Sequence, residues 1–135
     1  MAEYTNIAVQ TVDPNRNVLF TDVAKFCDGG ILHRNGSGQF ALKGGHTYLI
    51  LFNADITNAT AAAVVSLALA INGEPIAATT MAYTPATAGV SNAVSAFTEV
   101  KVPPCTNYTL SVVNNNVNTA TVSFANLIIK KECAG

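Results

Sequence analysis

The chain has 135 residues, of which 50% are hydrophobic and only 11% are charged, with seven Lys and Arg against eight Asp and Glu. Soluble domains usually carry about 25% charged residues, and a disordered chain needs low hydrophobicity and high net charge, so this composition excludes disorder. The lack of a basic excess argues against a nucleic-acid partner, and the length predicts one domain.

Apolar and alternating runs between turn residues predict strands throughout the first half of the chain. Turn residues cluster at 13–15, 28–30, 35–38 and 44–45, where Asp, Asn, Gly and Pro gather. Regularly spaced turns of this kind are typical of an all-β sandwich or barrel. The strands are expected over residues 7–9, from residue 18 toward the turn at 28–30, and over residues 31–33, 39–42 and 47–54.

The second half of the chain continues the same pattern, with a hairpin predicted at Asn72-Gly73, the strongest short hairpin signal. The alanine content of residues 59–70 favours a helix, but the apolar alternation from Val65 to Ile71 favours a strand. The strands are expected over residues 62–71, 76–83, 93–102, 108–113 and 119–130, and the connections at 84–91, 103–104 and 114–118.

Neither a membrane-spanning segment nor a secretion signal is expected. The longest apolar stretch, residues 61–71, is shorter than the ~20 residues that cross a bilayer, and the first residues lack a positive start and an apolar core. Cys27, Cys105 and Cys133 match no zinc or redox spacing. We expect free thiols in a reducing compartment, with a Cys27–Cys133 bridge as the alternative if the first and last strands are neighbours.

No combination of residues predicts catalysis or cofactor binding. His33 and His46 lack carboxylate partners at motif spacing, so turn or strand-edge positions are expected, with a histidine ring around a threefold axis as the alternative. The aspartates follow no calcium-loop spacing, and Gly36-Ser37-Gly38 lacks the nucleophile-elbow pattern. An aromatic content of 7% without Trp is poor for stacking sugars or bases. We therefore expect no enzyme activity, no cofactor and no metal.

Two strands are apolar on both faces, whereas a sandwich strand with one wet face alternates. Residues 48–52 are apolar at every position and residues 122–129 nearly so. If both lie in one sheet, its outer face is more apolar than monomers usually expose, and a subunit interface would cover it. Which alternate set faces the partner stays open, because both sets are apolar. The interface candidates are Tyr48, Ile50, Phe52, Phe97, Phe124, Leu127 and Ile129.

Eight segments follow one another in a characteristic order along nearly the whole chain. They are Asn17-Val-Leu-Phe20, Gly30-Ile-Leu-His33, Phe40-Ala-Leu42, Gly45-His-Thr-Tyr-Leu-Ile50, Val65-Ser-Leu-Ala-Leu-Ala-Ile-Asn-Gly73, Val100-Lys-Val-Pro-Pro-Cys105, Thr109-Leu-Ser-Val-Val-Asn114 and Ala125-Asn-Leu-Ile-Ile-Lys130. In order and spacing they resemble tumour-necrosis-factor (TNF)/C1q-like jelly rolls. The resemblance is closest to the bacterial branch, which includes the C-terminal domain of collagen-like spore-surface glycoproteins and phage and prophage structural proteins.

The resemblance implies an all-β, two-sheet antiparallel jelly-roll sandwich of about ten strands that forms a tight homotrimer. Residues 1–12 would be an N-terminal arm or first strand, and residues 13–135 the single jelly-roll domain. One sheet of the family faces the threefold axis. Here that sheet would contain the segments near residues 7–9, 18–20, 48–52, 93–102 and 119–130, which include both strands that are apolar on two faces.

The expected function is that of a non-enzymatic structural protein, a homotrimeric phage virion component that decorates the capsid or forms a head- or tail-fibre module. It would reside in the virion, contact other virion proteins through the N-terminal arm and bind a host-surface glycan. A trimer on a spore or cell surface is the first alternative. A carbohydrate- or receptor-binding module with contact loops at 85–91 and 114–118 is the second. Neither nucleic acid nor membrane insertion is expected.

Overall fold

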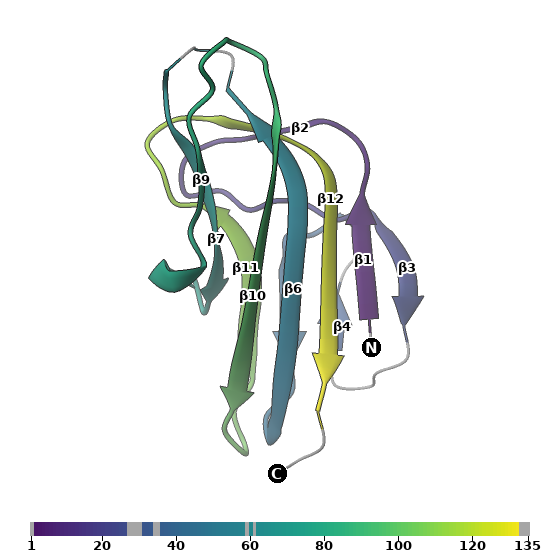
Figure 1. Ribbon diagram of the computed structural model, residues 1–135. Coiled ribbons are helices and arrows are strands. Elements are labelled where there is room, and N and C mark those ends of the chain that lie inside the picture. The colour runs from purple at the N-terminus through teal and green to yellow at the C-terminus, as the bar shows by residue number, and fades with distance from the viewer. Residues whose placement is uncertain (1, 27–30, 34–35, 59, 61, 133–135) are drawn as a thin grey trace.

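The computed structural model describes residues 2–26, 31–33, 36–58, 60 and 62–132, and these form two antiparallel six-stranded sheets packed face to face (Figure 1). The one helical element in these ranges is a single 3-10 turn, η1 (Ala77–Thr79). None of the helical structure in these ranges is long and apolar enough to cross a membrane. The all-β expectation is confirmed.

The first sheet contains the long strands of the chain. Its order is β10-β6-β12-β1-β3, and β2 also pairs with β12. The N-terminal segment therefore lies inside a sheet, because β1 pairs with β12 on one side and with β3 on the other. The strands are β10 (Asn92–Val102), β6 (His46–Thr57), β12 (Ala120–Lys131), β1 (Ala2–Asn6), β3 (Asp22–Phe26) and β2 (Gln10–Val12).

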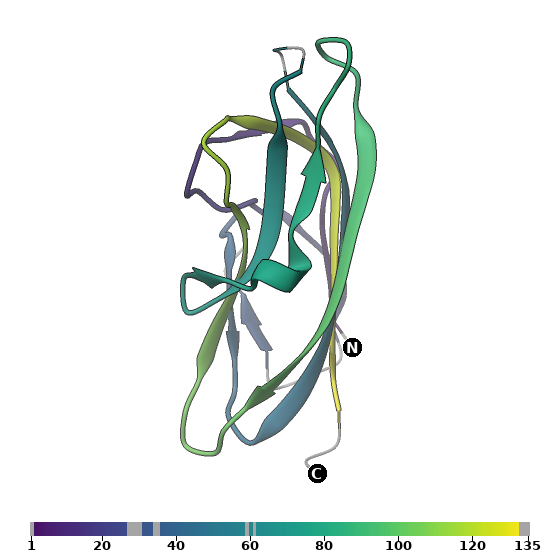
Figure 2. The ribbon, with the colours of Figure 1, turned by 60° about the vertical axis from the view of Figure 1, so that its left-hand side comes forward.

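The second sheet has the order β4-β5-β11-β7-β8, with β9 also paired to β7. Figure 2 turns the molecule so that the two layers can be followed from the side. The strands are β4 (Ile31–His33), β5 (Gln39–Leu42), β11 (Tyr108–Asn114), β7 (Val65–Ile71), β8 (Glu74–Pro75) and β9 (Met81–Tyr83).

The core lies between the sheets and is formed by alternate residues of the strands, as the pleat requires. On β6 the even-numbered residues from Tyr48 to Ile56 are buried. Aromatic rings link the layers, since Phe20 packs edge-on against both Phe40 and Phe52, with ring centroids 5.4 and 6.3 Å apart. Burial of these side chains is the main stabilising contribution to the sandwich.

One of the expected strands is wrong, and the strand expected from residue 18 begins later, at Asp22 of β3. Residues 7–9 follow β1 instead of forming it, and Ile7 and Val9 are each 70% exposed. Residues 18–20 are extended and bury Val18 and Phe20, but they belong to no strand, and the Val18 amide donates to the Val112 carbonyl of the second sheet at 2.8 Å. Alternation of apolar and polar residues indicates which side chains face the core. It does not indicate whether the backbone is hydrogen-bonded to a neighbouring strand over several residues.

The other expected strands are confirmed, with differences at their ends. Residues 31–33 and 39–42 match β4 and β5, and residues 47–54 lie within the longer β6. The strand expected from residue 62 begins at Val65, because Ala62 has a φ of +61°, outside the extended region that regular strand residues occupy. The strand expected over 76–83 is interrupted by η1. The helix alternative for residues 59–70 is wrong, since β7 occupies residues 65–70.

The hairpin predicted at Asn72-Gly73 is present, and both residues have the positive φ of a type I′ turn, +53° and +83°. The Asn72 side chain adds a contact to the neighbouring strand, because its Oδ1 accepts the Thr109 amide at 2.9 Å. Asn72→Ala should therefore lower the free energy of unfolding by about 1–2 kcal/mol, through the left-handed backbone and the lost hydrogen bond. Urea unfolding measures the change, and Asn92→Ala, at an exposed strand start, is the neutral control.

Candidate functional site on the outer face of the first sheet

The strand register places three apolar residues side by side on the outer face of the first sheet. Phe97 on β10 is opposite Leu51 on β6, and Leu51 is opposite Ile128 on β12. We call these three residues the apolar row. Phe97 is 63% exposed, and Leu51 and Ile128 are half-buried at the surface. The chain thus presents a continuous apolar strip across three strands.

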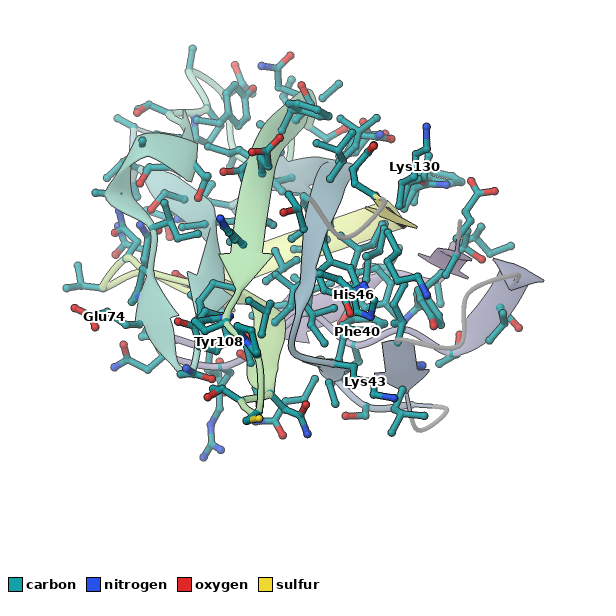
Figure 3. The ribbon with its side chains drawn as sticks, turned by 90° about the horizontal axis from the view of Figure 1, so that it is seen from below. Phe40, Lys43, His46, Glu74, Tyr108 and Lys130 are labelled. Atoms are coloured by element: carbon teal, nitrogen blue, oxygen red, sulfur yellow. The ribbon has the colours of Figure 1, made fainter. Side chains whose placement is uncertain are left out.

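Polar and charged residues border the apolar row along the strands. On one side Glu99 and Lys130 flank Leu49, and Lys130 projects away from the sandwich (Figure 3). On the other side Ser95, Asn53, Asn126 and Thr5 form a polar row. An apolar centre with a polar margin is the usual composition of a protein interface.

Five of the seven interface candidates point away from this face. Tyr48, Ile50, Phe52, Leu127 and Ile129 are fully buried between the sheets, whereas Phe97 and Phe124 are exposed. The two strands that are apolar on both faces lie in one sheet, as the resemblance implies, and they are hydrogen-bonded neighbours there. The question of which alternate set faces outward is answered by the structure. Leu49, Leu51 and Ile128 belong to the outward set, and the sequence analysis did not select them.

Phe124 reaches the outer face through a β-bulge. The register between β12 and β6 shifts between Ser123 and Asn126, and Phe124 has a φ of +53° and is 62% exposed. A bulky residue in the left-handed region is uncommon and stores about 1–3 kcal/mol of strain. The strained backbone at Phe124 therefore lowers the stability of the fold while it holds an aromatic side chain in solvent. Bulges of this kind often mark functional positions.

Asn126 sits in the polar row with one buried oxygen that has no partner. Its Nδ2 donates to Glu3 Oε2 at 2.6 Å, while its Oδ1 accepts no hydrogen bond from the part of the chain that the structure describes. An unsatisfied buried acceptor costs about 1–3 kcal/mol. The outer face thus combines exposed apolar side chains with a buried acceptor that lacks a partner within the described part of the chain.

No family model and no curated protein matches this sequence. Among solved structures, the globular domain of zebrafish complement 1qA protein superposes with a TM-score of 0.63 at 13% identity, over 93% of each chain. The fold is the TNF/C1q-like jelly roll. Murine APRIL shares this jelly roll, with a TM-score of 0.59 at 10% identity, over 96% of this chain and 98% of that one.

The two histidines occupy packing positions in the jelly roll. The His33 ring stacks on Phe40 at a centroid distance of 4.2 Å, and its Nε2 donates to the Ser37 carbonyl at 2.9 Å. His46 packs edge-on against Tyr48 at 6.3 Å. The described residues contain no group of three or more His, Cys, Asp or Glu that could hold a metal ion. Cys105 is an exposed free thiol, and Cys27 and Cys133 lie outside the described residues.

The two loops expected to contact a ligand differ in how their polar groups are used. In the turn at 114–118, Asn114 is fully buried and donates to the carbonyls of Val12 and Asn118, at 2.9 and 2.8 Å. The Asn118 amide donates to Val64 O at 2.8 Å. These side chains hold the jelly roll together. The loop at 84–91 leaves Val90 about half exposed, and the Val90 carbonyl accepts from Thr57 Oγ1 at 2.7 Å.

Proposed function

We propose that this chain is a non-enzymatic structural module that assembles as a homotrimer through the outer face of the first sheet. The apolar row of Phe97, Leu51 and Ile128, exposed on one face of a single chain, is the observation that carries the proposal. Such a strip in water favours association, because burying it removes apolar surface from solvent. The threefold symmetry comes from the resemblance to the TNF/C1q family.

The low charge of the whole chain supports the same proposal. Only 11% of the residues are charged, so little electrostatic repulsion opposes the contact between copies. In addition, β10 forms one edge of the first sheet, with β6 as its strand partner. Edge strands in soluble proteins are usually covered or protected, and packing of a second copy against this side of the sheet would cover β10.

The proposed location of the trimer is the surface of a phage virion, as capsid decoration or as a fibre module. A trimer suits threefold or quasi-threefold sites on a shell, and an exterior rich in Thr, Asn, Ser and Ala suits a stable coat. Two measurements test the proposal: the mass of the purified protein in solution, and mass spectrometry of virions from cells that carry the gene. A monomer at micromolar concentration contradicts the assembly, and a trimer found on cells or spores but absent from virions contradicts the location.

Asn126→Asp tests the polar row within this interface. The substitution replaces the donor to Glu3 Oε2 with a second carboxylate at the same short distance, 2.6 Å in the native pair. Like-charge repulsion should lower the free energy of unfolding by about 2 kcal/mol at neutral pH. Asn53→Asp adds the same charge on the neighbouring strand β6, across β12 from Glu3, and serves as the control. Equal losses in thermal unfolding for the two variants would contradict a specific Asn126–Glu3 contact.

A further inference from the structure

A polar hollow lies in the segment that leaves β2 and crosses toward the second sheet, over residues 10–19. Its volume is about 570 Å³, which is within the range of small-molecule sites, about 300–1,000 Å³. Val12 and Val18 of this segment point into the core, while Thr11, Asp13 and Asn17 line the hollow. The two buried valines therefore anchor the segment at both ends, while the polar side chains between them stay at the surface.

The two ends of the segment are tied together by one side chain. Gln10 Nε2 donates to the Leu19 carbonyl at 3.0 Å, and the Leu19 amide donates to Gln10 Oε1 at 2.9 Å. These two hydrogen bonds close residues 10–19 into a ring. A compact closed loop of this kind is frequently functional.

The far end of the ring is held by the buried Asn114. The Asn15 amide donates to the Asn114 carbonyl, the Asn114 amide donates to the Arg16 carbonyl, and Asn114 Nδ2 donates to the Val12 carbonyl, each at 2.9 Å. Asn114 has no solvent exposure. The backbone that forms the hollow is thus held by hydrogen bonds before any ligand arrives, which lowers the entropic cost of ordering it on binding.

Several polar side chains that line the hollow have unused hydrogen-bonding capacity. Thr11, Asn15, Arg16 and Asn17 make no side-chain hydrogen bond to other described residues, and Asp13 uses Oδ1 to accept from Thr119 Oγ1 at 3.2 Å. The hollow therefore offers two amides, a hydroxyl, a guanidinium and a carboxylate oxygen. Leu19, 45% exposed, adds a small apolar surface.

We infer that this hollow binds a saccharide. Each sugar hydroxyl can both donate and accept a hydrogen bond. The amides of the hollow also do both, the carboxylate accepts, and the guanidinium donates. Leu19 can pack against the C–H face of a sugar ring. A metal ion is disfavoured, since one carboxylate stands beside the Arg16 cation. No aromatic side chain lines the hollow, so neither a sugar ring nor a nucleobase can stack on one there, and the saccharide would be held by hydrogen bonds and by Leu19.

The test is a glycan array probed with the labelled full chain, followed by titration of the best glycan. Wild-type protein should bind a subset of glycans, and the double variant Arg16→Ala/Asn17→Ala should lose at least tenfold in affinity. Gln10→Ala, which opens the ring, should weaken binding less. Lys101→Ala, an exposed strand residue outside the hollow, is the matched control.

Two outcomes overturn the inference: wild-type protein that binds no glycan on the array, and a double variant that binds the same glycans with unchanged affinity. Thermal unfolding of each variant separates loss of the site from loss of the fold. The result is independent of the proposed trimer, because none of the apolar row lines the hollow. Sedimentation of the same variants reports the assembly state separately.

Discussion

Leu51→Asp is expected to give a folded monomer, whereas Ile50→Asp, one residue away on the same strand, is expected to give no folded protein. Ile50 is fully buried between the sheets, and an unpaired carboxylate there costs more than most domains can tolerate. Leu51 lies on the outer face, in the centre of the apolar row. A charge at Leu51 leaves the core intact and prevents close contact with a second copy.

Sedimentation velocity and circular dichroism measure the two properties separately. Leu51→Asp should keep the β-sheet spectrum while association weakens by at least 100-fold, which corresponds to about 3 kcal/mol. Leu32→Asp is the matched control, because Leu32 is 70% exposed on β4 of the second sheet and should affect neither property. A Leu51→Asp protein that stays trimeric would contradict the proposal that the outer face of the first sheet is the subunit interface.

Phe124→Gly is expected to change stability and association in opposite directions. Glycine adopts a φ of +53° without strain, so the single chain should gain about 1 kcal/mol of unfolding free energy. The same substitution removes an exposed aromatic side chain from the proposed interface. Aromatic anchors often contribute 2 kcal/mol or more to binding, so association should weaken by roughly 10- to 100-fold.

The two effects are measured in separate backgrounds. Urea unfolding of Phe124→Gly in the monomeric Leu51→Asp protein reports the strain alone, and sedimentation of the single variant reports association. Phe97→Ala is the control, because Phe97 is an exposed aromatic on the regular strand β10 with no positive φ. It should weaken association without stabilising the chain. A stabilising Phe124→Gly that associates as tightly as wild type would leave the bulge without a role in assembly.

Local signals predicted much of the fold. The hairpin turn at Asn72-Gly73 and the strands β4 and β5 are determined by residues close by in the sequence. Their predicted positions therefore agree with the structure. The segment 18–20 depends on a partner almost a hundred residues away, since the Val18 amide bonds Val112. Apolar alternation predicted the burial of Val18 and Phe20, but a short pattern contains no information about so distant a backbone partner.

The candidate site was predicted at the level of strands and not of residues. On β6 both Ile50 and Leu51 are apolar, so the sequence cannot assign the inward side, which closure of the two sheets decides. The bulge at Phe124 then changes the alternation within β12. The hollow at residues 10–19 had a usable signal, because Val12 and Val18 stand on either side of an evident polar turn.

The alternation on β6 has a consequence for how the sequence can change over time. Residues 48, 50, 52, 54 and 56 pack inside one chain, and residues 49 and 51 lie on the surface beside Phe97 and Ile128. In a lineage that keeps the fold but acquires a different assembly, we expect substitutions at 49, 51, 97 and 128 together. The intervening even-numbered positions of β6 would stay apolar, so the ancestry of the fold and that of the assembly can be traced separately along one strand.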